Sequence, residues 1–293
     1  MTGISRIIHT VVSSLNIETA FISLSERWSW FNKFIPLSRQ YSAGTIKKVF
    51  RNEVDFELDI SDYMQWHIWA ALKDNSWKLM LEKSKNDQKI VFDIGANVGA
   101  FCLKVGRAFS VEKSDSKVFA FEPNPEVYNN LKRNYDRNLN LKNNVILEQI
   151  GLSNKPDTLK FSWDKSNSGG GTFVPRENTI AENLIEVPVV SLDYYVELNK
   201  IERIDFIKLD VEGYEPIVLE GARKVLENFK PELYVEVSPK WWENAGYSVS
   251  EVLGWIEQLQ YKFVVYSFGK PKIISLKELS SIESQFDVHI IPS

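Results

Sequence analysis

The sequence predicts an α/β fold built on a mostly parallel β-sheet with helices on both faces. From about residue 89 onward, short apolar runs alternate with segments whose apolar residues repeat at helical spacing. Such alternation is typical of strand–helix–strand units, in which the crossover helix returns the chain to a parallel neighbouring strand. The 293 residues are also enough to bury one large core without disulfides.

Composition narrows the class of protein. Hydrophobic residues make up 44% and charged residues 25%, as in an ordinary globular protein. The formal net charge of -4 does not favour binding to a nucleic-acid backbone, which normally requires a basic patch, so we expect no nucleic-acid partner. Cys102 is the only cysteine, which excludes an intrachain disulfide and a four-cysteine zinc site and favours a reducing, cytoplasmic location. No run reaches the roughly 18 apolar residues of a membrane span, so we expect no transmembrane segment. The N-terminus also lacks the pattern of a signal peptide.

Residues 1–85 differ in character from the rest and predict a cap made of helices and a hairpin. The runs 45–50 and 54–60 alternate in part between apolar and polar residues, which indicates the two strands of the hairpin. Asp62 then suits the N-cap of a helix that ends near residue 72. Further helices are predicted over 1–24 and 76–83.

Residues 86–293 form the predicted main domain. Its strands are apolar and short, as expected of strands that are buried on both faces. They are predicted over 89–94, 117–121, 144–149, 204–209, 232–237, 261–266 and 286–291. Its helices are predicted over 99–109, 125–138, 215–228 and 249–258. Because only a short linker separates the last two strands, we expect them to form an antiparallel pair at one edge.

The segment 151–191 interrupts this alternation and predicts two extra strands, over 158–163 and 184–190. Between them lies a run from Ser166 to Thr172 with three successive glycines. Glycine imposes little rigidity on the backbone. The run therefore predicts either a mobile loop near a ligand or a plain hairpin turn.

A glycine-rich turn follows the first strand of the main domain. Asp93 ends the strand, and Gly95, Asn97 and Gly99 follow at alternate positions before a helix begins. Open parallel sheets bind nucleotide-like ligands at the carboxyl ends of their strands, where glycine lets the backbone approach closely. Glu122 ends the next strand, where an acid can accept hydrogen bonds from ribose hydroxyls. The Gly-x-Gly-x-x-Gly spacing of a pyrophosphate site is absent, so we expect S-adenosylmethionine rather than NAD.

Three blocks carry a more specific signal: VFDIGANVG at 91–99, FAFEPNP at 119–125 and IDFIKLDVEGYE at 204–215. Together, and in this order, they resemble FkbM-type methyltransferases, and the resemblance covers roughly residues 58–238. The DVEG run in the third block is the most discriminating. The resemblance implies a Rossmann-like class I methyltransferase fold with a seven-stranded sheet. The better-known members of that family methylate hydroxyl groups on natural products or sugars.

The resemblance implies cofactor contacts at the matched positions. The pocket for the methionine part of S-adenosylmethionine would be shaped by Asp93, Gly95, Asn97 and Gly99. Glu122 would hold the ribose, with Pro123 and Asn124 fixing the turn beside it. Gly151 and Leu152 follow the third strand and fall where such folds contact adenine.

Three acids at the ends of two strands are the candidate catalytic residues. A hydroxyl acceptor must lose its proton during methyl transfer, and a carboxylate within hydrogen-bond reach can accept it. Asp210 is the first candidate, because the resemblance places it beside the transferred methyl group. Glu236 at the end of the next strand is the second. Glu212 is the third, although it could instead accept hydrogen bonds from amides at the start of the following helix.

Two further points bear on catalysis. Asp210 and Glu236 could alternatively hold a divalent cation that polarises the acceptor hydroxyl, but we favour a reaction without a metal ion. Many family members carry a histidine shortly after the acid of the fifth strand, whereas this chain has Ser238 and Pro239 there. If that histidine is the base elsewhere, this protein uses another group or an acidic acceptor.

We therefore expect a methyltransferase that uses S-adenosylmethionine to methylate a hydroxyl on a small molecule or saccharide. A rival function is N-methylation of protein or nucleic acid, but the Asn/Asp-Pro-Pro-Tyr/Phe motif of base-amine enzymes is absent. A non-catalytic cofactor-binding subunit and a nicotinamide oxidoreductase are two more rival functions. The cap and the segment 151–191 are expected to determine acceptor specificity.

Overall fold

The structure is a computed structural model that describes residues 18–27, 29–71, 76–82, 88–164, 166–174, 184–267 and 270–293. The chain divides into two compact units, residues 1–75 with 165–169 and residues 76–164 with 170–293. The predicted division into a cap over 1–85 and a main domain over 86–293 stays a prediction. Most of the helix predicted over 1–24 lies outside the described residues, which begin with α2 (Glu18–Arg27).

The first unit contains the predicted hairpin. β1 (Ile46–Arg51) pairs antiparallel with β2 (Val54–Asp59). Asn52 and Glu53 between them both have left-handed backbone angles, with φ of 48° and 62°, which suit a tight two-residue hairpin turn. Alternate residues of β2, beginning with Val54, are buried, so one face of this strand packs into the core of the unit.

Asp62 caps α3 (Tyr63–Trp69), as predicted. One oxygen of its carboxylate accepts the backbone N–H of Gln65 at 2.8 Å. The same side chain also accepts hydrogen bonds from the backbone N–H and the hydroxyl of Ser168, which belongs to the same unit. The cap residue therefore joins two segments that lie far apart in the sequence. Two 3-10 helices, η1 (Ser29–Phe34) and η2 (Ser38–Gln40), complete the described part of this unit.

The second unit is built on a mixed sheet of eight strands in the order β13-β12-β14-β11-β10-β3-β4-β5. The run from β5 to β11 is parallel, and β14, β12 and β13 are antiparallel to their neighbours. The seven strands predicted for this domain all occur. The bounds are β3 (Ile90–Ile94), β4 (Lys117–Phe121), β5 (Val145–Glu148), β10 (Phe206–Leu209), β11 (Glu232–Val237), β12 (Tyr261–Ser267), β13 (Lys270–Ile274) and β14 (Phe286–Pro292).

The prediction of a seven-stranded sheet was one strand short, because β13 falls in the segment predicted as a linker. β13 is exposed along all but its last residue and contains two lysines and a proline. These are the marks of an edge strand, which carries no apolar alternation. The expected antiparallel pairing of β12 with β14 is confirmed, but β13 and not this pair lies at the edge.

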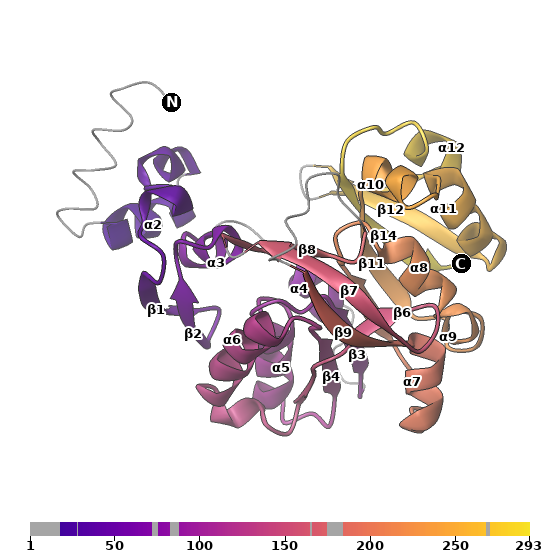
Figure 1. The fold of residues 1–293 in the computed structure, drawn as a ribbon, viewed down its shortest axis with the longest axis horizontal. Helices are drawn as coiled ribbons and strands as arrows, with labels where there is room; N and C mark the ends of the chain where they lie inside the picture. Colours follow the sequence, from indigo (N-terminus) through magenta and orange to yellow (C-terminus); the bar gives the residue numbers. More distant parts are fainter. Residues whose placement is uncertain are drawn as a thin grey trace. The chain divides into compact units, whose positions relative to one another are not determined.

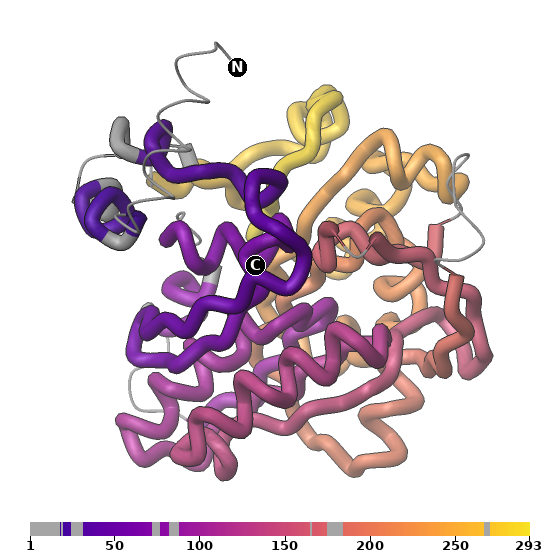
Figure 2. The backbone as a smooth tube through the Cα atoms, turned by 60° about the vertical axis from the view of Figure 1, so that its left-hand side comes forward, coloured from indigo at the N-terminus to yellow at the C-terminus, as the bar shows by residue number. Residues whose placement is uncertain are grey.

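Helices cover both faces of the large sheet, as predicted (Figure 1). One face carries α4 (Ser76–Glu82), α5 (Cys102–Val111) and α6 (Pro125–Asp136), and α5 and α6 lie side by side in both views (Figures 1 and 2). The other face carries α7 (Leu192–Leu198), α8 (Glu215–Glu220), α9 (Arg223–Asn228), α10 (Pro239–Asn244), α11 (Val249–Gln258) and α12 (Leu276–Leu279). None of the helices in the described part of the chain has the length and apolar character of a membrane span.

Strand alternation sorts side chains between these two faces. Phe92 and Ile94 of β3 pack into the core beneath α7 to α12, and Ile207 and Leu209 of β10 do the same. The residues between them therefore point to the face of α5. Lys208 is one of these residues, and its register partner on β3 is another.

The single helix predicted over 215–228 is broken into α8 and α9. Gly221 lies at the break, and a β-carbon at that position would collide with the backbone carbonyl oxygen of Ser153. The helix therefore ends where it comes into close contact with β6 (Gly151–Ser153). This approach depends on a residue that is distant in sequence, so helical periodicity could not reveal it.

The segment 151–191 forms a separate four-stranded sheet in the order β6-β9-β7-β8. Its other strands are β7 (Asp157–Asp164), β8 (Asn167–Thr172) and β9 (Leu184–Ser191). The three glycines lie within β8, so both predictions for them, a loop and a hairpin turn, were wrong. The ring of Phe161 packs directly over Gly171, where any β-carbon would collide with it. The glycines therefore make room for side chains that cover the strand.

The turn after β3 packs closely against the backbone at the end of β10. A β-carbon on Gly95 would collide with the carbonyl oxygen of Asp210, and Gly95 also has a left-handed φ of 85°. The amide of Asp210 in turn donates to the carbonyl of Ile94 at 3.1 Å. Glycine at position 95 therefore allows two strand ends to meet.

We expect Gly95→Ala to destabilise the protein far more than Gly246→Ala. Gly246 lies in the same unit with a similar φ of 88°, but a β-carbon there meets nothing within 4 Å. The control should cost about 1 kcal/mol for the left-handed backbone, and Gly95→Ala roughly 2 kcal/mol more for the collision. Midpoints of urea unfolding would measure this difference, and equal midpoints would contradict the proposed close packing.

Candidate functional site

The candidate site lies at the carboxyl ends of β3, β4, β10 and β11, where open parallel sheets bind ligands. Hydrogen bonds join these ends to one another. The amides of Gly95 and Ala96 both donate to the carbonyl of Phe121 at the end of β4, at 3.1 and 2.9 Å. The amide of Glu122 donates to the carbonyl of Glu148 at the end of β5. The strand ends therefore form one connected rim.

Asp93 supports the glycine-rich turn from beneath. Its carboxylate is completely buried and accepts the backbone N–H of Cys102 at the start of α5, at 3.1 Å. Burial raises its pKa to about 6, and the nearby Lys208 ammonium opposes that rise. Gly95, Asn97 and Gly99 above it all have left-handed φ, and Asn97 accepts the amide of Val98 with its own side chain. These backbone angles and hydrogen bonds therefore fix the conformation of the turn.

Glu122 is placed where the sequence predicted a ribose contact. Its two carboxylate oxygens accept the amides of Asn97 and Asn124, each at 3.0 Å. The side chain is 6% exposed, and burial raises its pKa to about 7. Asn124 caps α6 through the amide of Glu126, and Pro123 lies between these two acceptors. Glu122 thus joins the turn after β3 to the start of α6.

The two residues predicted to contact adenine are both buried. Gly151 and Leu152 lie in β6, and Leu152 belongs to the core beneath α7 to α12. The ring of Phe173 lies against Gly151, where a β-carbon would meet it at 2.8 Å. Ser153 at the end of the strand shares a 2.9 Å hydrogen bond with the hydroxyl of Tyr214. Their contact with adenine stays a prediction.

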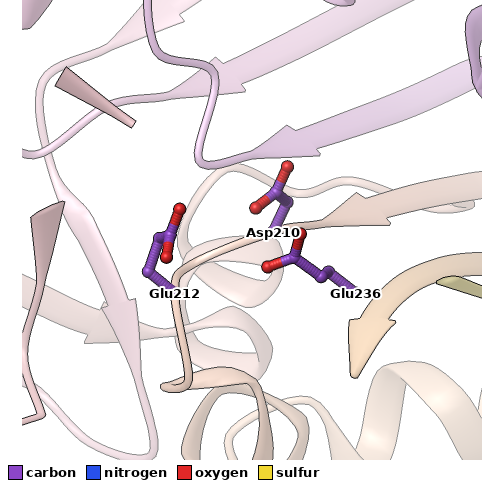
Figure 3. Close-up of side chains that lie close together, drawn as sticks. All are labelled: Asp210, Glu212 and Glu236. Atoms are coloured by element: carbon purple, nitrogen blue, oxygen red, sulfur yellow. The ribbon is translucent and has the colours of Figure 1, made fainter. Parts of the chain in front are cut away.

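The three predicted catalytic acids come together. One carboxylate oxygen from each of Asp210, Glu212 and Glu236 lies within 4.8 Å of the others. Figure 3 shows their carboxyl groups turned toward one another, with Asp210 and Glu212 on the loop after β10 and Glu236 on β11. Within the described residues, they are the only group of acidic, histidine or cysteine side chains that could share a metal ion. The structure thus joins the ends of two neighbouring strands in one acidic cluster.

Glu236 is the most perturbed acid of this cluster. Burial and the charges of Asp210 and Glu212 raise its pKa to about 9, so it carries a proton at neutral pH. One of its oxygens accepts the side-chain N–H of Gln285, from the loop before β14. Its other oxygen is buried and accepts no hydrogen bond from the described part of the chain. Glu236 therefore offers a proton donor rather than a base.

The loop that carries Glu212 is shaped by Glu215, a residue to which sequence analysis gave no role. Glu215 is fully buried and accepts the amides of Val211 and Gly213 at 2.9 and 3.2 Å. It also accepts the indole N–H of Trp242 at 2.8 Å. Burial raises its pKa to about 7. Glu215 is the last residue of the third motif block and the first residue of α8, where an acidic side chain stabilises the helix. This position in the sequence could have indicated that Glu215 has a structural role.

Lys208 is the second residue that sequence analysis missed. Its ammonium group lies 3.1 Å from Asp210 and 3.8 Å from Asp93. A lysine in the middle of a short apolar strand was the available signal, because such a residue is rarely buried without a charged partner. The ion pairs connect a cofactor candidate with a catalytic candidate.

A model of the methyltransferase FkbM domain matches residues 93–263, which is more than half of the chain. The chain belongs to the FkbM methyltransferase family. Among curated relatives, the hexuronic acid methyltransferase AglP of Haloferax volcanii is 28% identical over 56% of this chain and 63% of that protein. The methyltransferase sdnD of Sordaria araneosa is 32% identical over 53% of this chain and 67% of that protein. The chain thus spans slightly less than two thirds of the length of the first relative.

A solved structure of methyltransferase FkbM from Methylobacillus flagellatus aligns over 69% of this chain and 43% of that one, with 16% identity and a TM-score of 0.43.

The rim of this FkbM domain fits the ribose of S-adenosylmethionine. Glu122 uses one lone pair of each oxygen for Asn97 and Asn124, and a carboxylate offers about four such positions. Within the described residues the other two positions receive no donor, so ribose hydroxyls could use them. The same two amides hold the carboxylate in place in advance of binding, which reduces the entropy lost when a ligand is ordered.

We expect Glu236→Gln to become progressively more stable than the wild type as the pH rises from 5 to 9. The raised pKa of Glu236 means that the folded protein holds a proton that the unfolded chain releases above about pH 4.5. Its stabilising contribution is therefore complete at low pH and is lost as the pH approaches 9, whereas glutamine cannot ionise. Thermal unfolding of both proteins across this pH range would measure the difference in stability. Glu243→Gln, an exposed change on α10, should follow the wild type, and parallel curves for Glu236→Gln would contradict the expected shift.

Proposed function

We propose that this protein is an S-adenosylmethionine-dependent methyltransferase that acts on a hydroxyl group of a small molecule or saccharide. The observation that supports the acceptor chemistry is the acidic cluster of Asp210, Glu212 and Glu236 beside the glycine-rich turn. A hydroxyl needs a group that accepts its proton when it attacks a methyl group. Carboxylates at the end of β10 can meet that need.

The cofactor would be held by residues of the turn and the next strand. Glu122 would accept hydrogen bonds from the ribose, and Asn124 and Pro123 would border the same edge. Asp93 would support the turn around the methionine part, with Gly95 allowing close approach. When bound, S-adenosylmethionine supplies an electrophilic methyl group with a good leaving group, so positioning accounts for much of the acceleration.

Asp210 is the proposed base. Glu236 carries a proton at neutral pH, because burial and neighbouring acids raise its pKa to about 9, and it cannot accept a second one. It would instead donate a hydrogen bond to the acceptor or to a neighbouring carboxylate. Asp210 lies next to it, and within the described residues its carboxylate accepts a hydrogen bond only from the ammonium of Lys208. Its second oxygen is therefore available to a hydroxyl proton. Asp210 is also the first catalytic candidate from the sequence.

A neutral hydroxyl fits this cluster better than a carboxylate acceptor. Two negative charges about 5 Å apart in a partly buried site repel each other by on the order of 3 kcal/mol. One relative is named a hexuronic acid methyltransferase, which points to a saccharide but leaves the methylated group open. The charge of the cluster favours the hydroxyls of such an acceptor over its carboxyl group.

We expect calorimetry to detect binding of S-adenosylmethionine and of its demethylated product, and Glu122→Gln to weaken both at least tenfold. Glutamine keeps one acceptor oxygen, and its amide N–H groups would face a backbone N–H donor. Glu126→Gln, an exposed change on α6, is the matched control. The cofactor proposal fails if the wild type binds neither molecule, and the ribose role fails if the variant binds normally.

We also expect methyl transfer to prefer neutral acceptors. A panel of neutral glycosides and polyols should be compared with matched uronic acids, with mass spectrometry used to locate the added methyl group. The acidic cluster predicts at least tenfold higher kcat/KM for neutral acceptors and an ether product. Methyl esters as the main product would refute the hydroxyl proposal, although the protein would remain a methyltransferase.

A further inference from the structure

We propose that Lys208 is a positioning residue that holds the side chain of Asp210 in place for proton transfer by linking it to Asp93. This inference rests on the proposed function, because it assumes that Asp210 is the base. Lys208 belongs to the third motif block. In this role it touches no substrate itself and acts only through Asp210. The role follows from the sheet register, from the distances and from the set of partners of Asp210.

The sheet register brings the three residues together. Lys208 of β10 is the direct parallel neighbour of Asp93 on β3, so their side chains point to the same face of the sheet. Asp210 follows two residues later and leaves the strand on the same side. The spacing of two along β10 and the pairing across to β3 therefore place one cation between two acids.

The distances show which pair is stronger. The ammonium of Lys208 is 3.1 Å from one oxygen of Asp210, within hydrogen-bond range, and 3.8 Å from Asp93. The lysine side chain is 14% exposed and that of Asp93 is completely buried, whereas that of Asp210 is 35% exposed. Lys208 thus donates a hydrogen bond to the acid that faces solvent and the cluster, and it forms a longer ion pair with the buried Asp93.

Asp210 needs such a partner. Its backbone is held by the hydrogen bond from its amide to Ile94, but this bond does not restrict the side chain. In the described part of the chain, Lys208 is the only group that donates a hydrogen bond to its carboxylate. The nearby carboxylate of Glu212 would otherwise repel it toward solvent. The lysine therefore selects one orientation and leaves one carboxylate oxygen without a donor, as a base requires.

The same link couples the two halves of the site. Asp93 supports the glycine-rich turn through the amide of Cys102, while Asp210 faces the other acids of the cluster, where the acceptor would bind. Lys208 pairs with both acids, so one side chain links the residue beneath the glycine-rich turn to the proposed base. Neutralising the buried Asp93 alone would not require a hydrogen bond from Lys208 to Asp210.

A double-mutant cycle would test this role. Lys208→Met keeps the apolar stem and removes the charge and the donors, and it should be measured with the native Asp210 and in an Asp210→Asn background. We expect Lys208→Met to lower kcat at least 30-fold with native Asp210 but less than threefold with asparagine, because effects of coupled residues are not additive. Single-turnover measurements with excess enzyme keep the slow variants measurable.

Two controls separate positioning from a general structural effect. Affinity for S-adenosylmethionine, measured by calorimetry, should change less than threefold in Lys208→Met, and Lys208→Arg should recover at least tenfold of the lost kcat. Lys132→Met removes a lysine that pairs with Asp136 on the exposed surface of α6 and should leave kcat unchanged. If Lys208→Met does not fold, Lys208→Gln compared with Lys208→Arg provides the same contrast.

The outcomes distinguish this inference from the proposed function. An equal loss of kcat in both backgrounds, or a loss confined to cofactor affinity, would overturn the role of Lys208. If the Asp210→Asn variant is as active as the wild type, the role of Lys208 is overturned as well, because Asp210 is then not the base. Absence of any methyl transfer by a wild-type protein that binds the cofactor would count against the proposed function itself.

Discussion

The contact of Gly95 with the backbone of Asp210 is the constraint on which the site depends. A side chain at position 95 would push the end of β10 away from the turn after β3. Three other features of the site depend on this approach: the reach of Lys208 from one strand to both acids, the amide of Asp210 on Ile94, and the closeness of the acidic cluster to the glycine-rich turn. One missing β-carbon therefore lets two strand ends act as one surface.

Buried acids do most of the local organisation around that contact. Three buried carboxylates accept hydrogen bonds from backbone N–H groups near a strand end: Asp93, Glu122 and Glu215. Each of them is shielded from solvent. Their raised pKa values reflect burial that the amides only partly offset. Such groups cost stability at neutral pH, which is characteristic of sites that are shaped for binding rather than for folding.

Much of the fold could be predicted because it depends on local patterns. Apolar runs located most strands of the large sheet, and Asp62 marked the start of a helix. The errors occurred where packing, rather than local periodicity, decides the structure. Gly221 breaks a helix because it meets Ser153, which is distant in sequence, and the glycines of β8 leave room for neighbouring side chains such as Phe161. β13 is an exposed edge strand without apolar alternation, although its partner β12 directly precedes it.

The sequence by itself determined the fold class, the family and the identity of the acids, because periodicity and motif spacing are properties of the chain alone. Only the tertiary structure decided how the surroundings of those acids differ. The pKa of Glu236 is raised to about 9 because burial and neighbouring charges act on it in space. Lys208 and Glu215 gain their importance from partners that the sheet register and the α8 turn bring near them. The glycine-rich turn was recognisable from the sequence, but its contact with Asp210 depends on parallel strands that are more than 100 residues apart.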